Sequence, residues 1–234
     1  MPADNRTCQH CVILTGAGIS AESGLKTFRG ADGLWEGYRP EEVASIEAWE
    51  RDPERVLRFY NERRRQVRAA EPNAAHFALA RLEEHFPVTI VTQNVDDLHE
   101  RAGSRNVLHL HGEILWARSE KDADHRVYLE NRDIALGDCC PRGGQLRPDI
   151  VWFGEAVPAM AEAAGIVARA DLFAVVGSSL QVYPAASLLD LVPEHCDRFA
   201  IDPSIPASAR SLGFTSIPLP AAEGVTAWVE RLLS

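Results

Sequence analysis

The chain has few cysteines and few aromatic residues, and it lacks an apolar run long enough to span a bilayer. Five of its 234 residues are cysteine, and aromatic residues make up 7%. A sparse, odd number of cysteines argues against a disulfide framework, and the missing apolar run argues against a membrane protein. The first six residues also lack the apolar core of a signal peptide, so we expect a cytoplasmic protein.

Positive charge is also scarce. Lys and Arg number 24 against 34 Asp and Glu, which gives a net charge of −10. This excess of negative charge disfavours non-specific binding to nucleic acid. Hydrophobic residues make up 46% of the chain, which suffices for one large domain or for a large and a small one. We expect a globular monomer that binds neither nucleic acid nor a membrane.

Short apolar runs alternate along the chain with stretches of helical periodicity. The predicted strands are residues 12–15, 88–92, 107–110, 150–153, 172–176 and 199–201. The predicted helices are residues 53–70, 73–85, 95–102, 158–170, 185–191 and 221–232. Continuous apolar strands that alternate with helices are typical of a parallel sheet with helices on both faces, so we predict a Rossmann-like α/β fold.

Two regions interrupt this alternation. Residues 31–72 are rich in charge and aromatic side chains but offer no strand, and residues 116–146 are polar and irregular. We interpret both as insertions that pack together as a smaller module, helical in its first part. The larger Rossmann-like domain then comprises residues 1–30, 73–115 and 147–234.

A glycine-rich segment, residues 16–24, follows the first predicted strand. Its spacing Gly16-x-Gly18-x-x-Ala21 is the dinucleotide-binding pattern with alanine in the last position. Glycines let the backbone approach a phosphate, and the N–H groups of a helix start favour an anion. A dehydrogenase would continue with a second strand that ends in an acidic residue. Residues 28–35 read as a loop instead, so the segment predicts nucleotide binding without the dehydrogenase layout.

Polar side chains follow the strongest predicted strand, residues 88–92. Gln93, Asn94 and Asp96 come directly after it, at the edge where parallel sheets bind ligands. Asn94 or Asp96 could instead cap the following helix. The number of polar groups exceeds what a cap requires, so we favour a functional cluster.

Two histidines, His109 and His111, end the next predicted strand. Alternation puts both side chains on one face, with Leu110 opposite. An imidazole has a pKa near neutrality, which suits a general base, although a structural role is the alternative. Residues 177–179 add glycine and two serines after a further strand. The convergence of polar residues on four strand ends predicts one binding or catalytic site.

Taken together, these motifs resemble those of the sirtuins, the Sir2-type NAD-dependent protein deacylases, over nearly the whole chain. The motifs that carry the resemblance are residues 16–24 (GAGISAESG), 27–30 (TFRG), 92–96 (TQNVD), 109–112 (HLHG), 146–155 (LRPDIVWFGE) and 177–179 (GSS). The resemblance implies an NAD-binding Rossmann-like domain. It also implies that acyl groups are removed from protein lysines, giving nicotinamide and O-acyl-ADP-ribose.

The resemblance implies a role for each matching residue. The implied NAD-binding residues are Gly16, Ala17, Gly18, Ser20, Glu22, Phe28, Arg29, Gln93, Asn94, Val95, Asp96, Gly177, Ser178 and Ser179. Asn94 and Asp96 would act at the nicotinamide pocket, and His111 would be the general base. In the implied chemistry, the acyl-lysine oxygen attacks C1′ of the ribose as nicotinamide leaves. His111 then removes a proton from a ribose hydroxyl, and the acyl group ends on ADP-ribose.

The resemblance also implies how the substrate peptide is held. The segment that would pair with the peptide as an added strand consists of Val151, Trp152, Phe153, Gly154 and Glu155. The expected partners are therefore acylated lysine peptides and proteins.

Tyr60 and Arg63 are three residues apart on a predicted helix, hence on one face. A phenol and a guanidinium can hold a carboxylate by charge-assisted hydrogen bonds. The chain thus resembles the class III bacterial sirtuins, which remove succinyl and malonyl groups and carry this pair with a small residue, here Ala44. The alternative is an ordinary amphipathic helix with solvated arginines. We expect activity on acetyl groups and on succinyl or malonyl groups.

The family's structural zinc site is degraded in this chain. Zinc normally sits on two cysteine pairs, but Ser119 stands where a cysteine is expected, and the second pair is reduced to the adjacent Cys139 and Cys140. Tetrahedral zinc needs four ligands, so we expect no zinc and no other metal. His125 or Asp138 could complete an improvised site as an alternative.

Two further departures concern the NAD site. Lys26 replaces a common proline, and Ala200 replaces an asparagine that contacts the adenosine ribose in the family, although Asp202 or Ser204 could compensate.

Two rival functions stay open. A mono-ADP-ribosyltransferase would use the same pocket with a different acceptor, and the intact His111, Asn94 and Asp96 argue against a non-catalytic NAD-sensing protein.

Overall fold

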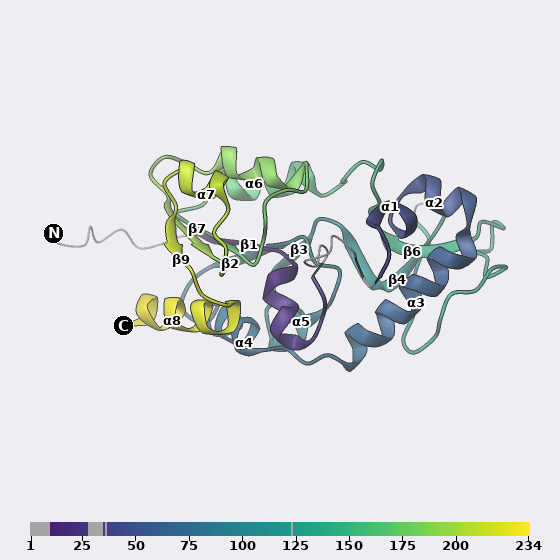
Figure 1. Ribbon diagram of the computed structural model, residues 1–234, viewed down its shortest axis with the longest axis horizontal. Coiled ribbons are helices and arrows are strands. Elements are labelled where there is room, and N and C mark those ends of the chain that lie inside the picture. Colours follow the sequence, from purple (N-terminus) through teal and green to yellow (C-terminus); the bar gives the residue numbers. More distant parts are fainter. Residues whose placement is uncertain (1–9, 28–34, 36, 123) are drawn as a thin grey trace.

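The structure is a computed structural model that describes residues 10–27, 35, 37–122 and 124–234. Phe28 and Arg29, both expected at the NAD site, lie outside the described residues. Figure 1 shows an elongated molecule with a larger sheet toward one end and a smaller sheet toward the other.

Six parallel strands form the larger sheet, in the order β3-β2-β1-β7-β8-β9. The strands are β1 (Cys11–Thr15), β2 (Val88–Thr92), β3 (Val107–His109), β7 (Leu172–Val176), β8 (Asp197–Ile201) and β9 (Thr215–Ile217). The strand order reverses at β1, and in such sheets ligands bind beyond the carboxyl ends of the strands at that point. The predicted α/β fold class is confirmed.

Helices cover both faces of this sheet (Figure 1). They are α4 (Ala74–Leu82), α5 (Leu98–Ala102), α6 (Met160–Val167), the 3-10 helix η2 (Ala185–Leu191), α7 (Ala207–Ser211) and α8 (Ala221–Leu233). Val12 and Leu14 of β1 pack into the cluster that contains α6, η2 and α7. Cys11 and Ile13 pack into the opposite cluster, which contains α4 and α8. Burial on both faces explains why the strand is apolar at successive positions.

The smaller sheet is antiparallel and has the order β5-β4-β6. Its strands are β4 (Gly112–Ser119), β5 (Arg126–Tyr128) and β6 (Leu146–Ile150), and the helices beside it are α1 (Pro40–Val43), α2 (Ile46–Arg51) and α3 (Pro53–Ala69). Helix α3 contacts both β4 and β6. We call this group of helices and strands the small module.

Helix α3 connects to the small sheet through buried polar contacts. Its start is fixed by Asp52, whose side chain accepts the N–H of Arg55 at 3.0 Å, and by a proline in the first turn. The Asn61 side chain exchanges two hydrogen bonds with the backbone of Ile134. The fully buried Arg64 donates to the Ile114 carbonyl at 2.7 Å. These contacts fix α3 against the sheet, and α3 carries Tyr60 and Arg63.

Two predictions about strands were wrong. Residues 150–153 do not form a strand of the parallel sheet, because Ile150 ends β6 and the backbone then runs as a loop with one bridge to Ser45. Residues 116–146 are not irregular throughout, because they contain the second half of β4, all of β5 and the first residue of β6. These strands bury mainly one face, so they lack the continuous apolar runs that identified the larger sheet.

The predicted helices agree more closely with the structure than the predicted strands do. Helices α3, α4 and α8 lie where the periodicity placed them, and α5 and α6 are shorter than predicted. Residues 185–191 form a 3-10 helix rather than an α-helix. No helix in the described part of the chain combines the length and apolarity that crossing a bilayer requires.

Two buried histidines lie beneath the larger sheet's ligand-binding edge. His76 of α4 and His99 of α5 are fully buried, and their ring centroids are 5.0 Å apart. Burial lowers the pKa of His76 to about 4, and burial also lowers the pKa of His99 well below its usual range. Both rings are therefore neutral in the folded protein at physiological pH.

We expect the fold to lose stability in acid because of these two rings. An unfolded histidine binds a proton below about pH 6.5, whereas folded His76 does not until about pH 4, so the unfolded state gains protons first. The free energy of unfolding should fall by about 1.4 kcal/mol per pH unit for each such histidine across that window. Urea unfolding measured between pH 7 and pH 4 checks this.

The matched variant is His76→Gln, which does not titrate. Its unfolding free energy should depend less steeply on pH than that of the unchanged protein. An equal slope in both proteins would contradict the assignment to His76.

Candidate active site

A cleft of about 470 Å³ opens at the carboxyl ends of β1, β2 and β7 and extends to the small module. The predicted site residues that line it are Gly16, Ala17, Gly18, Ala44, Tyr60, Gln93, Asn94, Val95, Asp96, His111, Val151, Trp152, Phe153, Gly154, Glu155, Gly177, Ser178 and Ser179. Residues from seven separate stretches of chain thus meet in one cavity, as the convergence of strand ends predicted.

Two glycine turns form the floor of the cleft and touch each other. Gly18 donates its N–H to the Gly177 carbonyl at 2.8 Å. A Cβ on Gly18 would lie 2.6 Å from the Gly177 Cα, and one on Gly177 would lie 2.3 Å from the Ile19 nitrogen. Gly177 also has a φ of 61°, which favours glycine. No side chain fits at either position, so the backbone itself faces the cleft.

Three N–H groups at these turns suit an anionic ligand. The amides of Ala17, Ser178 and Ser179 line the cleft and make no hydrogen bond within the part of the chain that the structure describes. Ala17 begins the 3-10 helix η1 (Ala17–Ser23). Unpaired amides at a helix start and in a glycine turn are a common site for phosphate.

Ser20 connects η1 with the polar residues after β2. Its hydroxyl donates to Asp96 Oδ2 and accepts from Asn94 Nδ2, each at 3.1 Å. Asp96 also accepts the N–H of Leu98, the first residue of α5, and it lines the cleft. Burial raises the pKa of Asp96. Ser20 itself is buried and holds the other two side chains from behind rather than lining the cleft.

A buried chain of hydroxyls supports the same loop. His99 Nε2 lies 3.0 Å from Thr15 Oγ1, which lies 2.8 Å from Thr92 Oγ1. Thr92 Oγ1 accepts the N–H of Asn94 at 3.0 Å. Gln93 is fixed separately, because its amide nitrogen donates to Ser178 Oγ at 2.9 Å. The loop that carries Gln93 and Asn94 is therefore held on both sides.

The structure distinguishes the two histidines after β3. His109 Nδ1 faces the Asn94 carbonyl and Nε2 lies 2.8 Å from a Glu100 carboxylate oxygen. Burial lowers the pKa of His109, but the hydrogen bond and charge of Glu100 outweigh burial, so its pKa is raised. This ring tends toward the cation and has both nitrogens occupied, so His109 has a structural role.

His111 has the opposite environment. Burial lowers its pKa, and a 3.0 Å contact between Nδ1 and the Gln93 carbonyl offsets this only in part. A carbonyl can only accept, so Nδ1 carries the proton and Nε2 keeps its lone pair. His111 lines the cleft, whereas His109 does not. A neutral imidazole with a free nitrogen in a cleft can act as a general base.

Aromatic side chains form the end of the cleft that lies in the small module. Tyr60 of α3 lies edge-on to Trp35, with ring centroids 6.2 Å apart, and both residues line the cleft together with Ala44. The Arg63 guanidinium lies over the same Trp35 ring at 5.7 Å. Arg63 is itself 7% exposed, donates to the Lys26 carbonyl at 3.0 Å, and lies behind the cleft wall.

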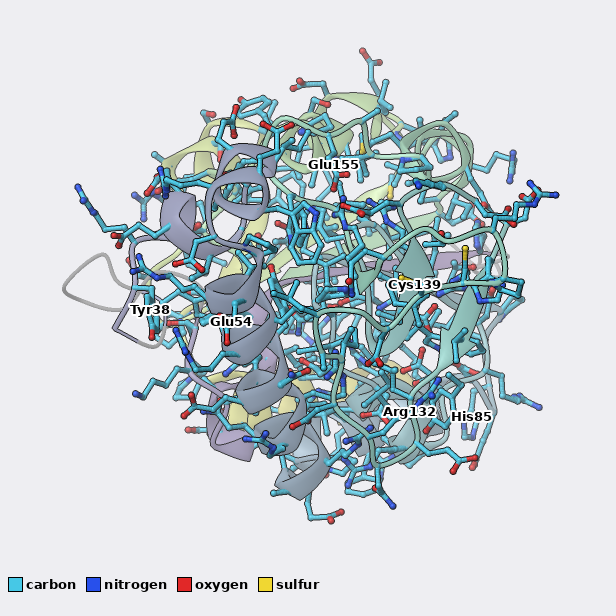
Figure 2. All side chains as sticks on the ribbon, turned by 90° about the vertical axis from the view of Figure 1, so that its right-hand side faces the viewer. Tyr38, Glu54, His85, Arg132, Cys139 and Glu155 are labelled. Atoms are coloured by element: carbon cyan, nitrogen blue, oxygen red, sulfur yellow. The ribbon has the colours of Figure 1, made fainter. Side chains whose placement is uncertain are left out.

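Glu155 organises the segment that follows β6. Its carboxylate accepts two hydrogen bonds from Arg147, one from Arg118 and one from the Trp152 backbone N–H. Glu155 is labelled in the upper part of Figure 2. The Val151 N–H donates to the His111 carbonyl, so the segment and the histidine are directly connected.

Some predicted residues lie elsewhere. Glu22 lies outside the cleft and accepts the N–H of Ala222 at the start of α8. Ala200 is buried in β8, while Asp202 reaches the cleft and accepts the Ser204 N–H at 2.7 Å.

Sequence reasoning also missed some of the lining. The cleft is further lined by Thr27, Trp35, Ile150, Val157, Gln181, Val182, Tyr183 and Pro184. Residues 181–184 follow the serines of the second glycine turn directly, and that position was the available signal.

The degraded zinc position carries a hydrogen bond. The Ser119 hydroxyl lies 3.1 Å from Cys140 Sγ, which also accepts the Gly144 N–H. Cys139 is exposed, and Figure 2 places it at the surface of the small module. Within the described residues no group of three or more His, Cys, Asp or Glu side chains gathers as metal ligands would. The residues present do not fit a tetrahedral zinc.

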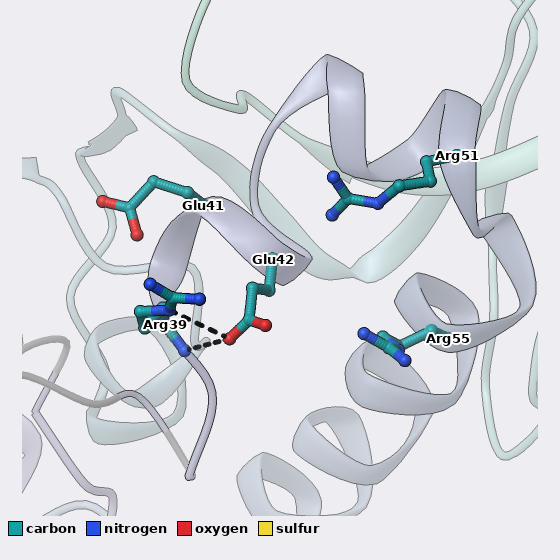
Figure 3. Close-up of a pocket in the computed structure, with 5 residues that line it drawn as sticks. All are labelled: Arg39, Glu41, Glu42, Arg51 and Arg55. Carbon is teal, nitrogen blue, oxygen red and sulfur yellow. Dashed lines mark hydrogen bonds and ion pairs between the residues drawn. The ribbon is translucent and has the colours of Figure 1, made fainter.

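A second hollow lies on the surface of the small module (Figure 3). It is lined by Arg39, Glu41, Glu42, Arg51 and Arg55. Glu42 accepts the backbone N–H of Arg39 and lies 3.6 Å from its guanidinium. The lining holds both signs of charge, three arginines and two glutamates.

Comparison with known proteins agrees with this geometry. A family model described as the Sir2 family matches residues 16–184. The chain belongs to the Sir2 family. An NAD-dependent protein deacylase of Helicobacter pylori is 58% identical over 195 residues, which are 83% of this chain and 85% of that protein. A protein of the same name from Bacteroides thetaiotaomicron is 47% identical over 222 residues, covering 93% and 95% of the two chains.

Solved structures of the family superpose closely on this one. A Sir2 homologue in complex with NAD gives a TM-score of 0.88 at 42% identity, covering 97% of this chain and 91% of the other. A Sir2 protein bound to an acetylated peptide gives a TM-score of 0.80 at 31% identity, with 97% and 94% covered.

Proposed function

We propose that this Sir2-family protein is an NAD-dependent deacylase that removes acyl groups from lysine side chains of proteins. The observation that carries the proposal is one cleft in which neutral His111, the loop of Asn94 and Asp96, and the paired glycine turns lie together. Relatives that cover most of the chain bear the deacylase name. The chemistry that bound NAD supplies is a glycosidic bond to nicotinamide whose cleavage leaves a reactive ribose.

The residues in the cleft suit this co-substrate. Ala17, Ser178 and Ser179 offer unpaired N–H groups to the phosphates, and the absence of side chains at Gly18 and Gly177 lets the ligand approach the backbone. Asn94 and Asp96 would hold the nicotinamide amide. Both are fixed through Ser20, so their geometry is set before the ligand arrives.

His111 would take the proton of a ribose hydroxyl. Its tautomer leaves Nε2 as the acceptor, and its pKa is lowered by burial, so the ring stays neutral at physiological pH. The Val151 backbone binds the carbonyl of the same residue, which keeps the base close to the segment 151–155. That segment would in turn bind the acylated peptide as an added strand.

Replacing His111 by alanine should remove deacylation and keep the fold. We expect kcat/KM on an acetyl-lysine peptide to fall by about 10²- to 10⁴-fold, as is typical for loss of a general base. In the unchanged protein, the acid limb of kcat/KM should have its midpoint below pH 6.5, because the pKa of His111 is lowered.

Formation of the deacylated peptide in the presence of NAD measures both, because this product forms after the step that His111 would catalyse. A fully active variant, or an acid midpoint above pH 6.5, would contradict the role. With labelled NAD, a deacylase should give labelled O-acyl-ADP-ribose in solution. Label attached to protein instead would favour a mono-ADP-ribosyltransferase.

The acyl end of the cleft favours an acidic acyl group. Tyr60 and Arg63 share one face of α3 and both contact Trp35. Arg63 currently donates to neutral oxygens, of Lys26 and of Gln66. A succinyl or malonyl carboxylate would be a stronger acceptor than either, because charge-assisted hydrogen bonds are stronger than neutral ones. The small side chain of Ala44 leaves room for the longer group.

Arg63→Met should weaken desuccinylation selectively. We expect kcat/KM on a succinyl-lysine peptide to fall about tenfold or more, while the value on the acetyl-lysine peptide changes little, because only the succinyl group carries the charge. Arg65→Met is the matched control, since Arg65 lies on the same helix but is exposed and pairs with Asp133. Equal losses on both peptides would contradict the carboxylate contact.

We also propose that the small module holds together without zinc. Ser119 and Cys140 make a hydrogen bond at the position where a metal would sit. The ring contact of Trp116 with Tyr128, at 5.3 Å between centroids, packs the same sheet. Packing and hydrogen bonds would thus stabilise the small module, as zinc held by four ligands stabilises it in relatives that keep both cysteine pairs.

Metal analysis of the purified protein should find zinc far below one atom per chain. A chelator should leave the melting temperature unchanged, whereas Ser119→Ala should lower stability by about 1 kcal/mol through the lost hydrogen bond. Stoichiometric zinc, or melting that depends on the chelator, would overturn the proposal.

A further inference from the structure

The buried Tyr60 hydroxyl has no acceptor for its proton among the residues that the structure describes. Tyr60 is fully buried and lines the cleft, and its oxygen accepts the indole N–H of Trp152 at 3.0 Å. Within the described residues, no acceptor lies within hydrogen-bonding distance of the Tyr60 hydroxyl proton. A buried hydroxyl normally finds a partner, so this proton is available for a ligand.

The Trp152 bond fixes where that proton points. A phenol O–H lies in the plane of its ring, so it has two positions, one on each side of the oxygen. Trp152 can only donate, because the indole nitrogen has no lone pair to offer. The indole N–H therefore occupies one side, and the Tyr60 proton must take the other. Without the indole N–H, the hydroxyl would be free to turn either way.

Trp152 is itself held rigidly. The Arg147 guanidinium lies over its ring at 3.4 Å from the centroid, and Trp49 packs near it with centroids 5.4 Å apart. Arg147 is anchored in turn by two hydrogen bonds to Glu155 and one to the Ile150 carbonyl. The indole N–H thus has a fixed direction, which is what a positioning group requires.

Charges of both signs act on Tyr60. Burial raises the pKa of Tyr60, so the group remains a protonated donor, while the positive charges of Arg147 and Arg63 and the negative charge of Glu155 act on it from nearby. A carboxylate placed at Tyr60 would accept the oriented O–H and would lie near two guanidinium groups, of which Arg147 already pairs with Glu155. An acetyl group has no oxygen that reaches this far along the chain, and so would gain nothing from the orientation.

We infer that Trp152 is a positioning residue for acyl-group selectivity, which orients the Tyr60 hydroxyl toward the carboxylate of an acidic acyl group. This rests on the proposed acidic-acyl activity and adds a residue to it. Trp152 lies on the peptide-holding segment, so its expected role was backbone pairing. The Trp152 side chain has a second function, orienting the Tyr60 hydroxyl, which backbone pairing with a peptide does not require.

The test is Trp152→Phe, which keeps an aromatic ring for Arg147 and Trp49 but removes the N–H. Affinities of a succinyl-lysine and an acetyl-lysine peptide are measured by fluorescence anisotropy, and kcat and KM are measured with NAD. The succinyl-to-acetyl ratio of affinities should fall about fivefold, as expected for one lost hydrogen bond, with the change in KM rather than kcat.

Trp49→Phe is the matched control. Trp49 neighbours Trp152 and also carries an N–H, but it donates to Glu120, away from Tyr60. Its effect on the two peptides should be equal. If Trp49→Phe lowered the ratio as much as Trp152→Phe, general loosening of the aromatic cluster would explain the result and the inference would fail.

A double-mutant cycle with Tyr60→Phe isolates the hydrogen bond. Once the hydroxyl is gone, Trp152→Phe should have no further effect on the ratio. A further drop of similar size would overturn the inference. The test also remains possible if Trp152→Phe folds poorly, because Tyr60→Phe removes the same hydrogen bond from its other side and leaves Trp152 intact.

The outcomes separate this inference from the proposed function. If Arg63→Met lowers the succinyl-to-acetyl ratio but Trp152→Phe does not, Trp152 has no positioning role and the acidic-acyl proposal stands. If neither variant changes the ratio, both are wrong. If peptides bind with the expected ratios but no NAD-dependent turnover occurs, the deacylase proposal fails while the role of Trp152 in binding is supported.

Discussion

The close contact between two glycine turns is the constraint on which the rest of the site depends. Gly18 and Gly177 lie in the turns that follow neighbouring strands, and a Cβ on either one would lie within 2.6 Å of the other turn. Their contact brings η1 against the β7 turn and thereby places Ser20 beneath Asn94 and Asp96. Larger side chains here would separate β1 from β7 at their carboxyl ends. The amides of the two glycine turns and the loop that carries Asn94 and Asp96 would then no longer be held in fixed positions around the cleft.

The surroundings of each histidine near the cleft, rather than the residue type, determine its protonation state and its role. His76, His99, His109 and His111 all lie close to the same edge of the sheet. Two are neutral because they are buried without a charged partner, one is pulled toward the cation by Glu100, and only His111 combines neutrality with access to the cleft. The sequence pattern alone gave no reason to prefer His109 or His111 as the general base. The two are distinguished in the structure by their partners, because His109 faces Glu100 and His111 faces the Gln93 carbonyl.

The parts predicted well are those whose physics is local. The strands β1, β2 and β7 are buried at every position and mostly apolar because both faces are covered, and the glycine turns follow from chain geometry alone. The small sheet was missed because β4 and β5 include partly exposed positions, and because β6 carries charged residues and a proline. The contact of Arg63 with Lys26, the bond between Tyr60 and Trp152, and the position of Trp35 in the cleft join distant residues, and no local pattern encodes them.

The hydrogen bond from Ala222 to Glu22 joins residues 200 positions apart and has a consequence for how the protein is made. Helix α8 packs against η1. During synthesis the glycine loop emerges early but lacks this neighbour until α8 has left the ribosome. A nascent chain that has already folded its sheet therefore still lacks one of the contacts that hold η1.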